Sequence, residues 1–414
     1  MRPAFWRIGD ELVRRPAPLS SESATKRNIL DRACGGLIHA ASARYQEGIE
    51  ETATFTSFSD TYAEARQKFL SLASERNANV VSRVHPTARG AQGEDLAIDI
   101  AAFGDPGAEK TLFLVSGTHG QEGFLGSALQ IEFLRHLEIP RGVNVVALHA
   151  LNPWGFSHLS RTDEANIDVN RNFTDYGVPF PQDELYPSLH RALCPDDWTE
   201  ETIDWSAARD ELARTYGVKR MVTAIGGGQI VEPTAMNFVG RAPSWSRTVV
   251  TDLLPGIFAK AQKVAFIEWH TGLGAYGELS HICMMAPGSA GYERVFNWMG
   301  DAARSTWAAS MDFTGGVTPD YRGWFSAWLP SIDSHKEWAG LVIEVGTYDV
   351  VTVVDALRMD RWLKFGRGRS SISRDEIRRT MMDRLNPSAP EWRTAALRNG
   401  LDAQTRALRG LQQW

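Results

Sequence analysis

Four short apolar runs with a shared ending constrain the fold of this chain more than any other feature. They are TLFLVSG (111–117), GVNVVALHALNP (142–153), KVAFIEWHTGLG (263–274) and GLVIEVGT (340–347). Each run passes directly into polar residues with a glycine or a proline, which is typical of a buried strand that ends at a loop. In parallel sheets, functional side chains gather just beyond such strand ends. The polar residues at these ends are therefore the first candidates for a site.

The segments between these runs predict helices. Residues 58–76 and 124–137 carry apolar side chains at helical spacing, and a Ser-x-x-Glu capping box opens a further helix at 374–385. Residues 95–104 alternate instead, and predict another strand. Strands that alternate with helices indicate an α/β fold whose sheet has substantial parallel content.

Composition argues against several classes of protein. The net charge of −6 provides no basic field, so nucleic acid is not an expected partner. Three cysteines without a Cys-x-x-Cys spacing argue against a disulfide framework and against a thiolate zinc site. No apolar run approaches the roughly 18 residues of a membrane span, and the charged, proline-broken N-terminus differs from a secretory signal. We therefore expect a cytoplasmic protein that does not bind membranes. Whether the chain forms a homo-oligomer stays open.

The same patterns divide the chain into two parts. Residues 1–53 predict an N-terminal extension of mixed helix and loop. Residues 54–414 predict the main domain, which has a helical C-terminal part and ample length to bury a core.

Three polar residues suggest a metal site. His119 and Glu122 follow the first run at a His-x-x-Glu spacing, and His270 ends the apolar run VAFIEW. Two histidines and one glutamate form one of the ligand sets of a catalytic zinc ion. Glycines around His119 and Glu122 permit a tight backbone path, and the positive end of the next helix favours an ionised Glu122. From the pattern alone, a loop histidine and a helix-capping glutamate explain these two residues equally well.

Further motifs accompany these residues in a fixed order. They are HGQEG (119–123), NPWGF (152–156), Arg161, NIDVNRNF (166–173), WHTGLG (269–274) and EVGT (344–347). Together they resemble the zinc metallocarboxypeptidase superfamily, and most closely a bacterial branch of carboxypeptidase-like proteins related to succinylglutamate desuccinylase and aspartoacylase. The resemblance covers roughly residues 55–410. It implies a mixed, largely parallel sheet flanked by helices.

The resemblance implies one zinc ion per chain, held by His119, Glu122 and His270. It also implies that Arg161 stabilises the oxyanion of the substrate and that Glu344 is the general base. Zinc lowers the pKa of its water toward 7 and polarises the scissile carbonyl, and a nearby carboxylate can pass the proton to the leaving amine. The structural alternatives are a surface ion pair for Arg161, and likewise for Arg171, and a buried, arginine-paired acid for Glu344.

The resemblance assigns Asn170 and Arg171 to a free carboxylate on the substrate. The planar guanidinium of arginine suits a carboxylate because it can donate two parallel hydrogen bonds. The chain is thus expected to be a metalloprotease of the carboxypeptidase type, acting on a short peptide or another small molecule. An N-acyl amino-acid deacylase of the aspartoacylase type would use the same ligand set and stays open.

The sequence departs from the family pattern at two points. The branch usually carries aspartate two residues before the third ligand, whereas this chain has Glu268, which is one methylene longer and changes how His270 can be oriented. The familiar carboxypeptidases also bring a mobile tyrosine over the substrate. Tyr276, Tyr321 and Tyr348 are all candidates for it.

Other function classes have weaker support. Residues 272–277 match the G-x-G-x-x-G pattern of dinucleotide-binding proteins, but Pro287 interrupts the segment before a helix can form. The G-x-S-x-G elbow of serine hydrolases does not occur. A binding module without catalysis is disfavoured because the metal ligands, Arg161 and Glu344 occur together.

Overall fold

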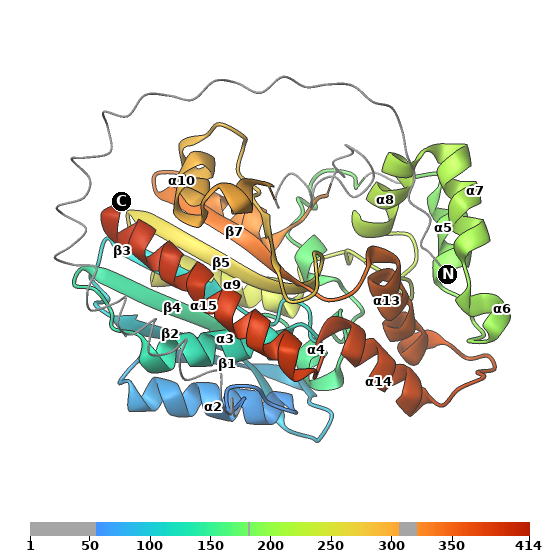
Figure 1. Cartoon of the computed structure of the whole chain (residues 1–414), viewed down its shortest axis with the longest axis horizontal. Helices are drawn as coiled ribbons and strands as arrows, with labels where there is room; N and C mark the ends of the chain where they lie inside the picture. The colour runs from blue at the N-terminus through green and yellow to red at the C-terminus, as the bar shows by residue number, and fades with distance from the viewer. Residues whose placement is uncertain (1–54, 181–182, 306–320) are drawn as a thin grey trace. The chain divides into compact units, whose positions relative to one another are not determined.

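A seven-stranded mixed sheet forms the centre of the fold (Figure 1). The computed structural model describes residues 55–180, 183–305 and 321–414. The strands run in the order β1-β2-β4-β3-β5-β7-β6; the four from β4 to β7 pair in parallel, whereas β1, β2 and β6 pair antiparallel. The strands are β1 (Asn79–Arg89), β2 (Asp95–Gly104), β3 (Lys110–Val115), β4 (Val143–His149), β5 (Lys263–Gly272), β6 (Leu279–Ile282) and β7 (Glu337–Gly346).

The four apolar runs of the sequence are the four parallel strands. Every residue of β4 is buried, and so is all of β3 after its first residue, because helices cover both faces of the sheet. The prediction of a mixed, largely parallel α/β sheet is confirmed. The predicted run at 142–153 is longer than the strand, which ends at His149 because Asn152 already caps the next helix, with its side chain accepting from Gly155 N at 2.8 Å.

Helices pack on both faces of the sheet. Side chains such as Leu114 and Ile267 point to one face, where they meet α2, α3, α10 and α15; Phe113 and Phe266 point to the other, where they meet α9 and α12. The alternation along β3 and β5 explains why both sets are apolar. These helices are α2 (Tyr62–Glu75), α3 (Gly123–His136), α9 (Trp245–Ile257), α10 (Ala290–Met299), α12 (Phe325–Trp328) and α15 (Pro390–Gln413).

A second group of helices lies beyond the carboxyl ends of the parallel strands. Figure 1 shows α5, α6, α7 and α8 gathered beside α13, which follows β7. Val354 and Leu357 of α13 pack against the apolar cluster that α5, α7 and α8 share. The remaining helices of this end are α4 (Pro153–His158), α5 (Tyr186–Leu193), α6 (Glu200–Ile203), α7 (Ser206–Tyr216), α8 (Val218–Gly226), α13 (Val350–Phe365) and α14 (Arg374–Leu385).

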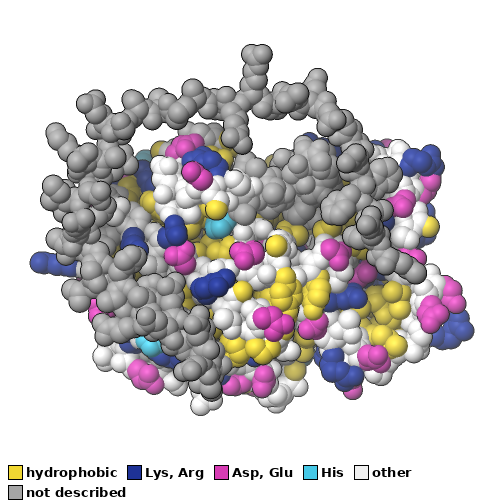
Figure 2. Space-filling view, viewed as in Figure 1, with side chains coloured by type: hydrophobic (Ala, Val, Ile, Leu, Met, Phe, Trp, Pro, Cys, Tyr) yellow, Lys and Arg dark blue, Asp and Glu magenta, His cyan; other side chains and the backbone are white. Residues whose placement is uncertain are grey.

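The described residues bear on three further predictions. Phe55–Trp414 forms one compact unit, and the predicted extension 1–53 lies outside the described residues. Among the helices described, none combines the length and apolar character needed to cross a membrane. On the face drawn in Figure 2, basic and acidic side chains are interspersed. The cytoplasmic location, the excluded partners and the state of assembly stay predictions.

Candidate metal centre and active site

Three side chains converge at the carboxyl ends of β3 and β5. His119 lies in the loop after β3, Glu122 at the N-terminus of α3, and His270 near the end of β5. One ligating atom from each lies within 4.8 Å of the other two, and all three side chains are buried. Among the described residues, this is the group of at least three His, Cys, Asp or Glu side chains placed to hold a metal ion.

Glycines make this convergence possible. A Cβ atom on Gly120 would lie 1.9 Å from the carbonyl carbon of Gly155, so only glycine lets the loop pass against the start of α4. Gly117 has a φ of 68°, and a Cβ there would lie 2.6 Å from the Cβ of Ala150. The predicted tight backbone path around His119 and Glu122 is therefore present. Its cause is the close approach of this loop to Ala150 and Gly155.

Each histidine lies between two carboxylates. Nδ1 of His119 is 2.9 Å from Oε1 of Glu122, and its Nε2 is 3.1 Å from Oδ1 of Asp168. Nδ1 of His270 is 2.8 Å from Oε2 of Glu122, and its Nε2 is 3.0 Å from Oε1 of Glu268. A neutral imidazole has one N–H, so when Nε2 donates to the outer carboxylate, Nδ1 and Glu122 present facing lone pairs. A metal cation bound between these lone pairs would make the arrangement favourable, so the donor set fits a metal ion.

The two outer carboxylates orient the candidate ligands. Glu268 is one methylene longer than the aspartate of the family pattern, but its Oε1 still lies 3.0 Å from Nε2 of His270. The same oxygen accepts from Oγ1 of Thr118 at 2.8 Å. Asp168 is completely buried; burial raises the pKa of its carboxyl, but Arg161 and His119 lower it by more and hold it well below its usual range. Carboxylates that accept from a metal-bound histidine fix its tautomer and ring plane.

Glu122 is held in its ionised form. Burial raises the pKa of its carboxyl, yet His119 and His270 lower it by more, to well below its ordinary value. The backbone N–H of Thr271 donates to Oε2 at 3.1 Å. Glu122 is also the N-cap residue of α3, where the helix dipole favours negative charge.

Arg161 points into the metal centre. Its Nε donates to Oδ2 of Asp168 and to Oδ1 of Asn237, both at 3.1 Å. One terminal nitrogen then lies 3.2 Å from Nδ1 of His119 and 3.5 Å from Oε1 of Glu122. Asp168 and Asn237 thus hold one side of the guanidinium, and its other side faces the candidate metal ligands. The ion pair of Arg161 with Asp168 is buried, so the alternative of a surface ion pair does not apply.

Arg171 is a buried cation that lines the same cavity as the candidate metal ligands. Its Nε donates to the carbonyl of Gly226 at 2.6 Å, and a terminal nitrogen donates to the carbonyl of Asn170 at 2.8 Å. The guanidinium lies 5.2 Å from the ring centres of both Tyr321 and Trp324. No aspartate or glutamate of the described part of the chain lies within ion-pair distance of it, and burial lowers its pKa. Oδ1 of Asn170 accepts from Phe325 N at 3.0 Å, which leaves the amide nitrogen to donate elsewhere.

Glu344 completes the cavity from β7. It lies opposite His270 in the register of β5 and β7, and the N–H of Leu273 approaches Oε2 at 3.4 Å. Burial and the neighbouring Glu122 carboxylate raise the pKa of Glu344 to about 7. No arginine forms an ion pair with it among the described residues, in contrast to the structural alternative for this acid. Its carboxyl can therefore exchange a proton near neutral pH.

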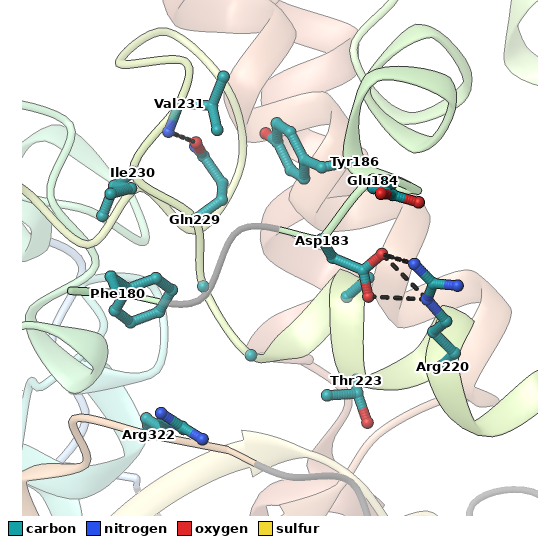
Figure 3. A pocket seen from close by; sticks show the side chains of 13 residues that line it. Phe180, Asp183, Glu184, Tyr186, Arg220, Thr223, Gln229, Ile230, Val231 and Arg322 are labelled. Atoms are coloured by element: carbon teal, nitrogen blue, oxygen red, sulfur yellow. Dashed lines mark hydrogen bonds and ion pairs between the residues drawn. The ribbon is translucent and has the colours of Figure 1, made fainter.

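The seven predicted site residues line one cavity of about 270 Å³. Tyr321 lines it too, whereas Tyr276 and Tyr348 pack on each other, with the Tyr348 hydroxyl donating to Asp383 at 2.7 Å. A second cavity of about 470 Å³ lies on the opposite side of α8, where Asp183 and Arg220 form a two-pronged ion pair (Figure 3). None of the predicted residues lines this second cavity.

Sequence comparison identifies the family. Residues 58–399 match the family model described as "Protein of unknown function (DUF2817)". The chain belongs to this family. No curated protein matches the sequence.

Several solved structures are similar to this DUF2817 protein. Carboxypeptidase A from Helicoverpa armigera is 12% identical, with a TM-score of 0.45 over 92% of this chain and 80% of the other. Bovine thrombin-activatable fibrinolysis inhibitor is 11% identical, with a TM-score of 0.43 over 86% and 99%. A succinylglutamate desuccinylase/aspartoacylase from Rhodobacter sphaeroides is 14% identical, with a TM-score of 0.34 over 70% and 65%.

The sequence did not reveal every residue of the site. Asp168 and Asn237, which anchor Arg161, were not among the predicted residues, although Asp168 lies inside the NIDVNRNF motif. Nor does the G-x-G-x-x-G match at 272–277 precede a helix: the short edge strand β6 follows it. It therefore lacks the helix N-terminus that would bind a pyrophosphate.

Proposed function

We propose that this protein is a zinc-dependent hydrolase that cleaves an amide bond in a small substrate with a free carboxylate. The observation that carries the proposal is the convergence of His119, Glu122 and His270, with each imidazole backed by a second carboxylate. A His₂Glu set is one of the catalytic zinc sets, and a closed structural zinc site would need a fourth protein ligand. Zinc held there would supply a Lewis acid and lower the pKa of a water molecule toward 7.

Glu344 is the proposed general base. It lines the same cavity as the candidate ligands, and its pKa near 7 suits a group that takes a proton and gives it back. In the proposed reaction, Glu344 takes a proton from the attacking water and delivers it to the nitrogen of the leaving amine. The water oxygen forms the new bond to the carbonyl carbon, and the C–N bond breaks.

Arg161 is the proposed stabiliser of the oxyanion. Its guanidinium is held by Asp168 and Asn237 before any substrate arrives, so its charge needs no reorganisation during the reaction. Its free face lies beside the candidate metal ligands, where charge develops on the carbonyl oxygen.

Arg171 is the proposed partner of the substrate carboxylate, with Asn170 as a second donor. A buried cation that forms no ion pair with a carboxylate is costly, and an anionic substrate group would compensate it. The same requirement is met by the C-terminal carboxylate of a short peptide and by the carboxylate of an N-acyl amino acid. Both the carboxypeptidase and the deacylase of the aspartoacylase type therefore remain candidate activities.

The experiment is a direct assay of the zinc-loaded protein. Dipeptides and N-acyl amino acids would be offered at equal concentration, each with its amidated counterpart, and the released amine measured. The proposal predicts release from at least one class, and weaker release from the amidated forms. Absence of turnover in both classes would overturn it.

A further inference from the structure

The catalytic cavity has a polar floor and an apolar wall. The floor is formed by the candidate ligands, the two arginines and Glu344. Apolar side chains of α8 and α13 line the same cavity. We call this surface the apolar wall; its members are Val218, Met221, Val222 and Ile225 of α8 with Val350 and Val354 of α13.

The apolar wall begins at the polar groups of the site. The carbonyl of Gly226 accepts from Arg171 at 2.6 Å, and that of Ile225 accepts from Asn237 at 2.5 Å. From there the wall follows α8 to Val218, a helical rise of about 10 Å. A Cβ placed on Gly272 would lie 3.3 Å from Val353 and 3.8 Å from Glu344, so the start of α13 is adjacent to the proposed base.

The outer end of the wall is exposed to solvent. Val218 is 41% exposed and Val350 is 46% exposed, although both line the cavity. Few large apolar side chains of the described residues are as exposed as these two, and both valines line the same cavity. Exposed apolar surface at the mouth of a cavity is typical of a ligand-binding groove. A substrate group that covers the wall would remove this surface from water.

The chemistry of the wall favours a hydrocarbon chain over a peptide. A peptide that extends beyond the scissile bond carries an N–H and a C=O in every residue, and each costs about 1–3 kcal/mol if it is buried without a partner. The side chains of the wall offer no such partner. Arg209 of α7 also borders the cavity, but Asp210 accepts from its guanidinium at 3.0 Å.

We propose that the apolar wall binds the aliphatic acyl chain of an N-acyl amino acid, whose carboxylate lies at Arg171. This inference rests on the proposed hydrolase function and selects between its two candidate activities. Hydrolysis of such a substrate breaks the amide C–N bond, adds the water oxygen to the acyl carbon and returns a proton to the amine. The products are a fatty acid and a free amino acid.

A chain-length series tests the proposal. The probes are N-acetyl-, N-butanoyl-, N-hexanoyl- and N-octanoyl-leucine, with the peptides Ala-Leu and Ala-Ala-Leu for comparison. We expect kcat/KM of the zinc-loaded protein to rise about threefold to fourfold for each added CH₂ until the wall is covered. The longer peptide should gain nothing over the shorter one. A flat acyl series, or a gain for the longer peptide that exceeds the acyl gain, would overturn the proposal.

Two substitutions on the wall sharpen the test. Val218→Asp and Val350→Asp each place a charge at the cavity mouth, and both positions are the first residue of a helix, where an acidic side chain is favourable. The ratio of kcat/KM for octanoyl over acetyl substrate should fall about tenfold in each variant. Val178→Asp is the matched control, because Val178 is 59% exposed and lines neither cavity. An equal fall of the ratio in the control would count against the wall.

A binding measurement separates this proposal from the proposed function. Calorimetry on the zinc-loaded Glu344→Gln variant reports affinity for the same acyl series without turnover. If affinity rises with chain length while the wild type cleaves nothing, the acyl site stands and the hydrolase proposal falls. If affinity is flat while the wild type cleaves dipeptides, the hydrolase proposal stands and the acyl site falls.

Discussion

Asp168→Asn is the perturbation that best probes how the candidate metal centre is supported. The carboxylate of Asp168 accepts from His119 Nε2 at 3.1 Å, from Arg161 Nε at 3.1 Å and from the N–H of Asn170 at 3.0 Å. Asparagine has one acceptor oxygen and one donor nitrogen. Whichever way its amide is turned, the nitrogen meets a donor from either His119 or Arg161.

The magnitude follows from these contacts. Hydrogen bonds to charged groups contribute about 1.5–3 kcal/mol each, and the variant loses one or two of them together with the negative charge. Breaking a buried pair in this way costs about 3–5 kcal/mol of folding free energy. Partners that orient a metal-bound histidine contribute about 10–100-fold to metal affinity. We therefore expect a less stable protein that binds zinc at least tenfold more weakly.

The assay is zinc competition against a chromophoric chelator, with denaturant unfolding in parallel. Asp360→Asn is the matched control, because Asp360 is buried, accepts from Arg161 N at 2.9 Å and from Lys364 Nζ at 3.2 Å, and does not contact the histidines. The control should lose stability and keep its zinc affinity. Equal zinc affinity in wild type and Asp168→Asn would refute the role given to Asp168.

Three further predictions concern single side chains. Glu344→Gln should keep its metal and lose about 10²–10⁴-fold in kcat, because the base is removed and no ligand is; a kcat like that of the wild type would exclude this role. Arg171→Ala should raise KM about 10–100-fold for free-acid substrates, and equal effects on amidated substrates would contradict the assignment. Burial and the neighbouring Glu164 raise the pKa of Asp163 to about 7, so the wild type loses stability as pH rises from about 4 to about 7. Asp163→Asn should escape this loss and exceed the wild type in unfolding free energy by about 1–4 kcal/mol at pH 8 but not at pH 4, and a difference independent of pH would contradict the prediction.

The central strands and the convergence of the site followed from sequence because burial on both faces leaves a clear pattern. Parallel strands that helices cover on both faces appear in the sequence as continuous apolar runs, and their carboxyl ends meet at one edge of the sheet. The predicted start of α14 is confirmed, because Ser373 is its N-cap residue and Oγ of Ser373 accepts from Glu376 N at 3.1 Å. The edge strands β1 and β6 left no such pattern, because β1 is largely exposed and β6 has four residues.

The residues of the apolar wall could not be predicted. An apolar helix face that lines a cavity has the same spacing as one that packs in a core, so α8 carried no separate signal. Asp168 and Asn237 act through contacts with residues far along the chain, because Asp168 reaches His119 across 49 positions and Asn237 reaches Arg161 across 76. The choice among three tyrosines likewise depended on tertiary structure, which brings Tyr321 to Arg171.

Metal analysis of the purified protein tests the central claim most directly. Elemental analysis after dialysis should find about one zinc ion per chain in the wild type, and little in His119→Ala and His270→Ala. His158→Ala is the control, because His158 stacks on Trp154 away from the cavity and should keep the wild-type content. Zinc content unchanged in both His119→Ala and His270→Ala would contradict the account of the metal centre.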